Sequence, residues 1–81
     1  MKVCDLISIM PDTYCEIAIN EYDGVKHTGR RYVIPEHSTD FTHIPADIWN
    51  HEVSAIMPYF GRISIEINID PQFEMRCTHA Q

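Results

Sequence analysis

The chain has 81 residues, of which 44% are hydrophobic, and a formal net charge of −6. This length gives one domain with a small core, and the hydrophobic content excludes an intrinsically disordered segment. The excess of twelve acidic over six basic residues argues against a phosphate-binding surface, because nucleic-acid-binding proteins present basic stripes. An acidic surface suits a basic partner, and it also serves ordinary solubility.

The chain is expected to stay inside the cell. No apolar run is long enough to cross a bilayer, and Asp5 and Pro11 interrupt the first apolar stretch, so we expect neither a membrane span nor a signal peptide. Three cysteines are an odd number, which without a secretion signal favours reduced intracellular thiols.

A short helix is predicted over residues 3–10. Its apolar side chains follow the spacing i, i+3, i+4 and i+7 and form one stripe: Val3, Leu6, Ile7 and Met10. Pro11 ends this helix, because proline disfavours helical backbone at the residue before it.

A β-hairpin is predicted next. Residues 14–20 form its first strand, in which alternate side chains share one face: Cys15, Ile17 and Ile19. Residues 21–24 contain the Asp-Gly turn signal, and residues 25–34 return as the second strand. Gly29 is expected to mark a bulge there, and Arg30 and Arg31 are expected to face solvent.

The connection after this hairpin is long for so small a domain. Residues 35–45 read as a loop, and loops of this length are often functional or disordered. Residues 45–50 are typical of a single helical turn that begins at Pro45, with Trp49 directed into the core.

Two further strands are predicted. In residues 52–59 three apolar side chains, Val53, Ala55 and Met57, alternate with Ser54, although Ile56 breaks the pattern. Pro58 places this strand at an edge of the sheet or ends it there. Residues 62–70 show the clearest alternation, since every odd position from Ile63 to Ile69 is isoleucine and every even one is polar. Phe60-Gly61 supplies the turn between these strands.

These elements predict an α+β fold within a single domain, residues 1–81. A short N-terminal helix packs on an antiparallel sheet of about four strands, and a C-terminal tail follows. The tail, residues 72–81, has four side chains of one parity that could add an edge strand: Phe73, Met75, Cys77 and His79.

Five histidines and three cysteines suggest a metal site. Thiolate and imidazole are the natural zinc ligands, and structural zinc sites usually have four of them. The predicted ligands are His37, His43, Cys77 and His79, which would join the long loop to the tail. Asp40, between the two loop histidines, could replace one of them or orient it.

The residues leave another interpretation of this cluster open. The spacing is not that of a zinc finger, so the histidines could be solvated and Cys77 could be a small buried hydrophobic residue. Cys4 and Cys15 are expected in the core, and His51 is a reserve ligand.

Catalysis finds little support in the sequence. The three glycines, Gly24, Gly29 and Gly61, are isolated and do not form a phosphate-binding loop. Glu66 and Asp70 read as the solvated face of a strand. We therefore expect a protein that is not an enzyme; a small metal-dependent hydrolase is the least favoured alternative, because it needs an open coordination position.

Three segments follow one another in a recognisable order: DLISIMPD at 5–12, IPADIWNHEV at 44–53 and PYFGRISIEI at 58–67. In this order they resemble a group of small proteins encoded by phages and gut-bacterial mobile elements. In that group a short helix ends at Ile/Met-Pro-Asp, and a proline turn precedes a terminal hairpin. The histidine loop and the Cys-x-His tail depart from this pattern.

In size, charge and Cys/His content the chain is similar to an anti-CRISPR protein, a zinc-containing inhibitor of type II-A CRISPR nucleases. This resemblance implies a non-catalytic inhibitor in the bacterial cytoplasm that binds a nuclease–guide RNA complex and blocks target-DNA loading. The resemblance also implies that the partner presents a basic protein surface, and we expect no direct nucleic-acid or membrane contact. Asp40, Glu66 and Asp70 are the residues we expect to contact it.

A different class of function remains open. The chain could be a phage accessory or structural protein that works as a homodimer, because the tail and the strand that contains Pro58 leave a sheet edge unprotected. The sequence is compatible with either a monomer or a homodimer.

Overall fold

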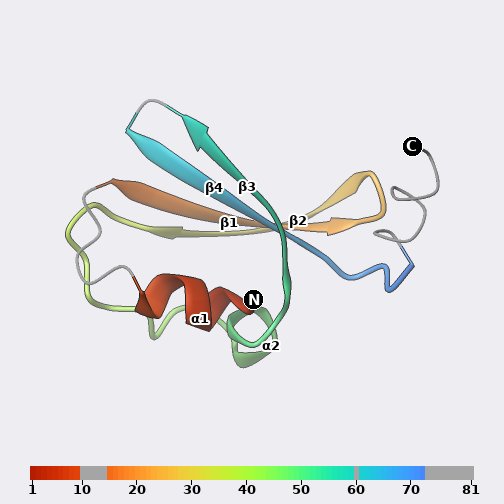
Figure 1. Ribbon diagram of the computed structural model, residues 1–81, viewed down its shortest axis with the longest axis horizontal. Coiled ribbons are helices and arrows are strands. Elements are labelled where there is room, and N and C mark those ends of the chain that lie inside the picture. The colour runs from red at the N-terminus through yellow and green to blue at the C-terminus, as the bar shows by residue number, and fades with distance from the viewer. Residues whose placement is uncertain (10–14, 60, 73–81) are drawn as a thin grey trace.

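The computed structural model describes residues 1–9, 15–59 and 61–72, and it shows an α+β fold (Figure 1). The elements in chain order are α1 (Val3–Ser8), β1 (Glu16–Asp23), β2 (Lys26–Ile34), α2 (Ala46–Trp49), β3 (Val53–Tyr59) and β4 (Arg62–Asn68). The predicted short N-terminal helix and four-stranded sheet are confirmed. The predicted edge strand in the tail falls largely on residues 73–81, which lie outside the described residues.

The sheet has the strand order β2-β1-β4-β3. Its two hairpins, β1–β2 and β3–β4, are antiparallel, whereas β1 and β4 run parallel in the centre. The sheet is therefore mostly antiparallel, and the parallel pair adds a feature that the sequence did not predict. Parallel strands need a crossover of a dozen or more residues, and the stretch 35–52, with the long loop and α2, supplies it.

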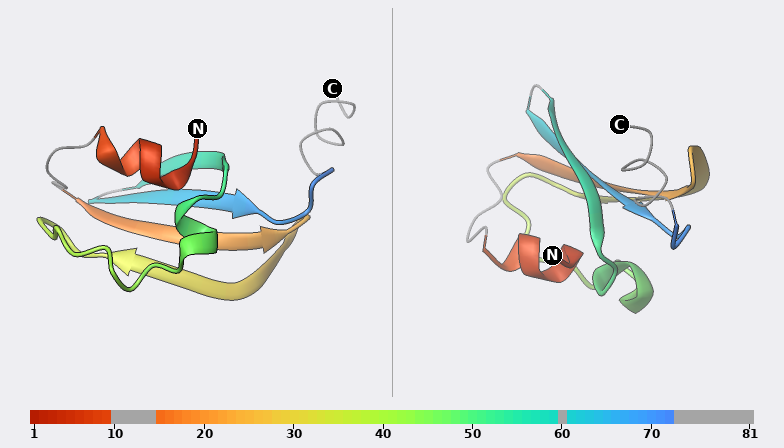
Figure 2. Two further views of the ribbon diagram at one scale, coloured as in Figure 1. Left: turned by 90° about the horizontal axis from the view of Figure 1, so that it is seen from below. Right: turned by 45° about the vertical axis from the view of Figure 1, so that its right-hand side comes forward.

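Both helices lie on the same side of the sheet, as the two directions of view in Figures 1 and 2 show. The buried core between them and the sheet consists almost wholly of isoleucine: Val3, Ile7, Ile17, Ile19, Ile34, Ile44, Ile48, Ile65 and Ile67. Each buried isoleucine stabilises the fold by roughly 1.5–3 kcal/mol relative to an exposed one. In the described part of the chain no helix lies on the other side of the sheet, and we call this side the open face.

The alternation predicted for residues 62–70 is confirmed along β4. Ile65 and Ile67 are fully buried and Ile63 packs against the core, whereas Ile69 is 46% exposed. Ile69 differs because β4 ends at Asn68, whose side chain bonds the backbone of Gly24 and so closes this end of the sheet.

The first hairpin turns later than predicted. β1 continues through Glu21 and Tyr22 to Asp23, so the turn lies at Gly24 and its successor. Asn20 of β1 pairs with Arg31 of β2, but Tyr22 pairs with His27. The single residue 21 of β1 therefore lies opposite three residues of β2, 28–30. Gly29 sits in this irregular stretch with φ of 97°, so the predicted bulge is confirmed.

A second bulge explains why Ile56 breaks the alternation in β3. Val53 pairs with Ile67, but two residues later Ala55 pairs with Glu66, so the pairing slips by one residue at Ser54. Ile56 then pairs with Ile65 and takes the helix side of the sheet. β3 is an outer strand, which confirms the edge position predicted from Pro58.

None of the helices in the described part of the chain is long and apolar enough to cross a membrane.

Truncation of the core should separate Ile65 from Ile69, two isoleucines of the same sequence pattern. Ile65→Ala should lower the free energy of unfolding by roughly 2–5 kcal/mol, because it leaves a cavity in a packed core. The matched control Ile69→Ala should cost less than about 1 kcal/mol. Urea denaturation measures both, and equal losses would contradict the observed end of β4.

Candidate partner-binding surfaces

The structure places half of the predicted zinc ligands. His37 and His43 both lie in the loop between β2 and α2, while Cys77 and His79 lie outside the described residues. Among residues 1–9, 15–59 and 61–72, no group of three or more His, Cys, Asp or Glu side chains could hold a metal ion. The four-ligand site therefore stays a prediction.

The two loop histidines have different surroundings. His43 Nε2 lies 2.8 Å from the carbonyl oxygen of Val33, and because a carbonyl only accepts, this nitrogen carries the proton and donates it. The imidazole thereby caps the outer edge of β2. His37 Nε2 lies 3.3 Å from Glu36 Oε1, and its φ of 61° is unusual for a residue other than glycine.

The other two cysteines are less deeply buried than the sequence suggested, and the reserve ligand His51 contacts the backbone. Cys4 on α1 and Cys15 before β1 are half-buried free thiols, so they border the core without belonging to its fully buried part. His51 Nδ1 lies 3.0 Å from the carbonyl oxygen of Glu52.

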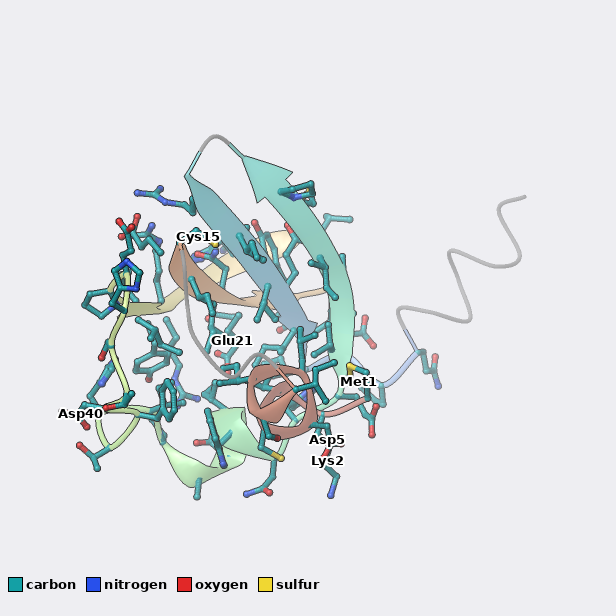
Figure 3. The ribbon with its side chains drawn as sticks, turned by 60° about the vertical axis from the view of Figure 1, so that its left-hand side comes forward. Met1, Lys2, Asp5, Cys15, Glu21 and Asp40 are labelled. Atoms are coloured by element: carbon teal, nitrogen blue, oxygen red, sulfur yellow. The ribbon has the colours of Figure 1, made fainter. Side chains whose placement is uncertain are left out.

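Asp40 is a fixed negative charge on the loop. Its Oδ1 accepts hydrogen bonds from the Thr42 hydroxyl at 2.6 Å and from the Thr42 backbone N–H at 3.0 Å. These bonds stabilise the carboxylate, the hydroxyl bond most, and they lower the pKa of Asp40. Figure 3 shows Asp40 at the outer margin of the loop, away from the sheet.

A mainly apolar hollow of about 440 Å³ adjoins this carboxylate, and we call it the loop hollow. It is lined by Thr39, Asp40, Phe41, Thr42, Ile44, Ala46 and Trp49. The rings of Phe41 and Trp49 stack with centroids 5.6 Å apart and an interplanar angle of 24°. Ile44 and Ile48 anchor the loop and α2 in the core, which holds these rings in place.

A buried carboxylate fixes α2 to the sheet. Glu21 is only 5% exposed, and it accepts a hydrogen bond from the Thr28 hydroxyl at 2.7 Å. Arg30 Nη1 lies 3.0 Å from Glu21 Oε2 and 3.0 Å from Asp47 Oδ2 on α2. Figure 3 shows Glu21 between the sheet and the helices.

The prediction that Arg30 faces solvent is thus only half right. Its guanidinium is partly exposed, yet it links β1, β2 and α2. Its hydrogen bonds to Asp47 and to the Tyr32 hydroxyl raise its pKa, and the same Arg30 bond lowers the pKa of Asp47. This network was hard to predict from the sequence, because the bulge at Gly29 decides which face of the sheet Arg30 takes.

The open face holds a second hollow, of about 530 Å³. It is lined by Glu16, Ala18, Asn20, Tyr22, Arg31, Met57, Gly61, Arg62, Ser64 and Glu66. Hydrogen bonds cross three strands here: Gly29 N–H donates to His27 Nδ1, which leaves His27 Nε2 to donate to Asn20 Oδ1 at 3.1 Å. Asn20 Nδ2 then donates to Ser64 Oγ at 3.2 Å.

The three residues expected to contact a partner lie on different parts of the molecule. Asp40 borders the loop hollow, and Glu66 lines the hollow of the open face. Asp70 follows the end of β4, so it does not share a strand face with Glu66. Its N–H donates to Asn68 Oδ1, and its own Oδ1 accepts from the Gln72 N–H.

The link between Arg30 and Asp47 predicts an acid-sensitive contribution to stability. Because the folded-state pKa of Asp47 is lowered, its contribution is present above the ordinary value of 3.8 and is lost as the pH falls through the folded-state value. Asp47→Asn should therefore melt below the native protein at about pH 7, and the difference should shrink toward about pH 2.5. Asp23→Asn, at the end of β1, is the control. A difference in melting temperature that is constant with pH would contradict this role.

Comparisons of the chain with protein-family models, with curated proteins and with solved structures gave no match.

Proposed function

We propose that this chain is a non-catalytic protein that attaches to a basic protein surface, with the loop hollow taking a lysine or arginine side chain of the partner. The observation that carries the proposal is the pairing of an ionised carboxylate, Asp40, with a mainly apolar hollow that contains stacked Phe41 and Trp49 rings. A hollow of this kind matches a side chain with an apolar stem and a charged end.

The chemistry of such an occupant follows from the lining. The methylene groups of a lysine or arginine would pack on Ile44 and Ala46, which the lining places in the hollow. The cation would lie near an aromatic face, where the ring quadrupole attracts it, and near the Asp40 carboxylate. Thr42 holds Asp40 through two hydrogen bonds, so little side-chain freedom is lost on binding.

The proposed partner class is a bacterial CRISPR nuclease–guide RNA complex. Such a complex holds its nucleic acid in a channel lined by basic residues. A protein of net charge −6 is steered to such a surface and competes with phosphate for it. In this proposal the chain blocks target-DNA loading by occupying the channel or a neighbouring lobe.

A structural zinc ion is part of the proposal, with His37, His43, Cys77 and His79 as its ligands. Metal-ligating histidines usually donate their other ring N–H to a carbonyl or carboxylate. The contact of His43 Nε2 with Val33 fits that pattern, because it leaves Nδ1 for the metal. Both loop histidines flank residues 39–42, so an ion held there would stiffen the loop hollow.

Asp40→Asn tests the role of the loop hollow in binding. This change keeps an oxygen for the Thr42 hydrogen bonds and removes the charge, so it should weaken association with the nuclease–guide complex by tenfold or more, on the order of one lost charged contact. Trp49 is the only tryptophan, and its fluorescence should change on binding. Asp23→Asn removes the same charge elsewhere and should bind as the native protein does.

A cleavage assay with excess protein, together with co-elution, decides the partner class. Inhibition and co-elution support it. An absence of both removes the CRISPR nuclease as partner, whereas inhibition that Asp40→Asn leaves unchanged removes the loop hollow as the contact.

Elemental analysis and thermal melting test the zinc ion. We expect one zinc per chain and a lower melting temperature in the presence of a chelator, because metal binding that joins loop and tail contributes to folding. Protein that contains no zinc and melts at the same temperature with and without the chelator would contradict the zinc site and favour the interpretation of the histidines as solvated residues.

The outer edge of β3 favours a second candidate, a phage accessory or structural protein that acts as a homodimer. In the described part of the chain, only the segment 1–3 pairs with this edge, at His51 to Val53. Ile56 is 49% exposed further along the strand. Antiparallel pairing of two β3 strands would satisfy the open backbone groups and cover Ile56.

A further inference from the structure

The open face carries two opposite charges in one row across the sheet. Asn20 on β1 pairs with Arg31 on β2 on one side and with Glu66 on β4 on the other. Paired positions of neighbouring strands direct their side chains to the same face, and all three side chains line the hollow of the open face. From β2 to β4 the row therefore carries a positive side chain, Arg31, a neutral one, Asn20, and a negative one, Glu66.

Neither charge is satisfied by its neighbours. Within the described residues, the side chains of Arg31 and Glu66 make no hydrogen bond or ion pair. The other two charges of the same hollow do pair, since Arg62 Nη2 lies 2.7 Å from Glu16 Oε2. Two strand spacings, about 10 Å, separate the backbones of Arg31 and Glu66. Asn20 between them already bonds His27 and Ser64.

We propose that the open face is a contact between two copies of this chain. A two-fold axis that runs parallel to β1 above Asn20 places Arg31 of each copy over Glu66 of the other. An axis across the strands would place like charges together, so the charge row selects the first arrangement. Each copy uses the same patch, as in closed symmetric dimers, and the strands of the two sheets run in the same direction, as in aligned sheet packing.

The rest of the face suits close approach of two sheets. The central positions beside the charge row are small, Ala18 and Ser64, and Tyr22 adds apolar surface. With the axis above β1, the strands β2, β1 and β4 overlap and β3 lies outside the contact, so seven residues of three strands cover on the order of 300 Å² of each copy. This area is below that of standard specific contacts, so the dimer is a weak and reversible one. The inference does not use the loop hollow of the proposed function, because both helices and the loop between β2 and α2 lie on the other side of the sheet (Figure 2).

Charge exchange tests this contact. Sedimentation equilibrium should show the native protein dimerising as its concentration rises toward about a millimolar. Arg31→Glu and Glu66→Arg should each be monomeric, since each variant places like charges together twice. An equimolar mixture of the two variants should dimerise again, because glutamate in one copy then meets arginine in the other at both contacts. The double variant should also dimerise.

Two controls make the result decisive. Thermal melts of each variant should be close to those of the native protein, since Arg31 is exposed, Glu66 is half-buried and neither has a partner within the described chain. Ile56→Lys should leave this dimer intact, whereas its loss in that variant would assign the contact to the edge of β3. A native protein that stays monomeric, or a dimer that neither charge reversal weakens, would overturn the proposal.

Discussion

The parallel pairing of β1 with β4 is the constraint on which the other features depend. It sets Ile17 beside Ile63 and Ile19 beside Ile65, so the two isoleucine stripes form one apolar strip down the middle of the sheet. Both helices pack on that strip, and the hairpin partners β2 and β3 are left as outer strands. A slip of one residue would exchange the isoleucines of β4 for Ser64 and Glu66, so the burial of this strip also fixes what the open face presents.

At Glu21 the apolar strip is interrupted by a carboxylate. The ion pair of this carboxylate with Arg30 connects the core to α2, which borders the loop hollow. Glu21 follows Ile17 and Ile19 on the helix side and lies beside Ile67, where its carboxylate is buried. A buried charge needs a partner, and Arg30 meets this need while also reaching α2. The position of Trp49 at the end of α2 thus depends on an ion pair that begins inside the sheet.

Local pattern predicted the elements of this fold, and contacts between distant residues decided their arrangement. The alternation around Ile65, the stripe that contains Ile7 and the turn at Pro45 were all readable from the sequence. The parallel pairing of β1 with β4 could not be predicted, because the residues of a strand do not indicate whether the neighbouring strand runs parallel or antiparallel. Each bulge reversed the face that the following side chains take. The sequence pattern therefore did not reveal that Ile56, which is 49% exposed, lies on the helix side, or that Arg30 forms ion pairs. For the site, Asp40 was selected for its charge, but the hollow beside it depends on the packing of Phe41 against Trp49.

The two outer strands are protected unequally. β2 is distorted by the bulge at Gly29, and the imidazole of His43 occupies the carbonyl of Val33 on its outer edge. β3 has Pro58 near one end and pairs with the segment 1–3 at the other, and among the described residues nothing pairs with its outer edge between them. Strand addition from another molecule can therefore take place at one side of the sheet but finds no regular template at the opposite side. Copies that meet at these edges would therefore stop at a pair, so the described sheet offers no route to a fibril that grows by adding strand upon strand.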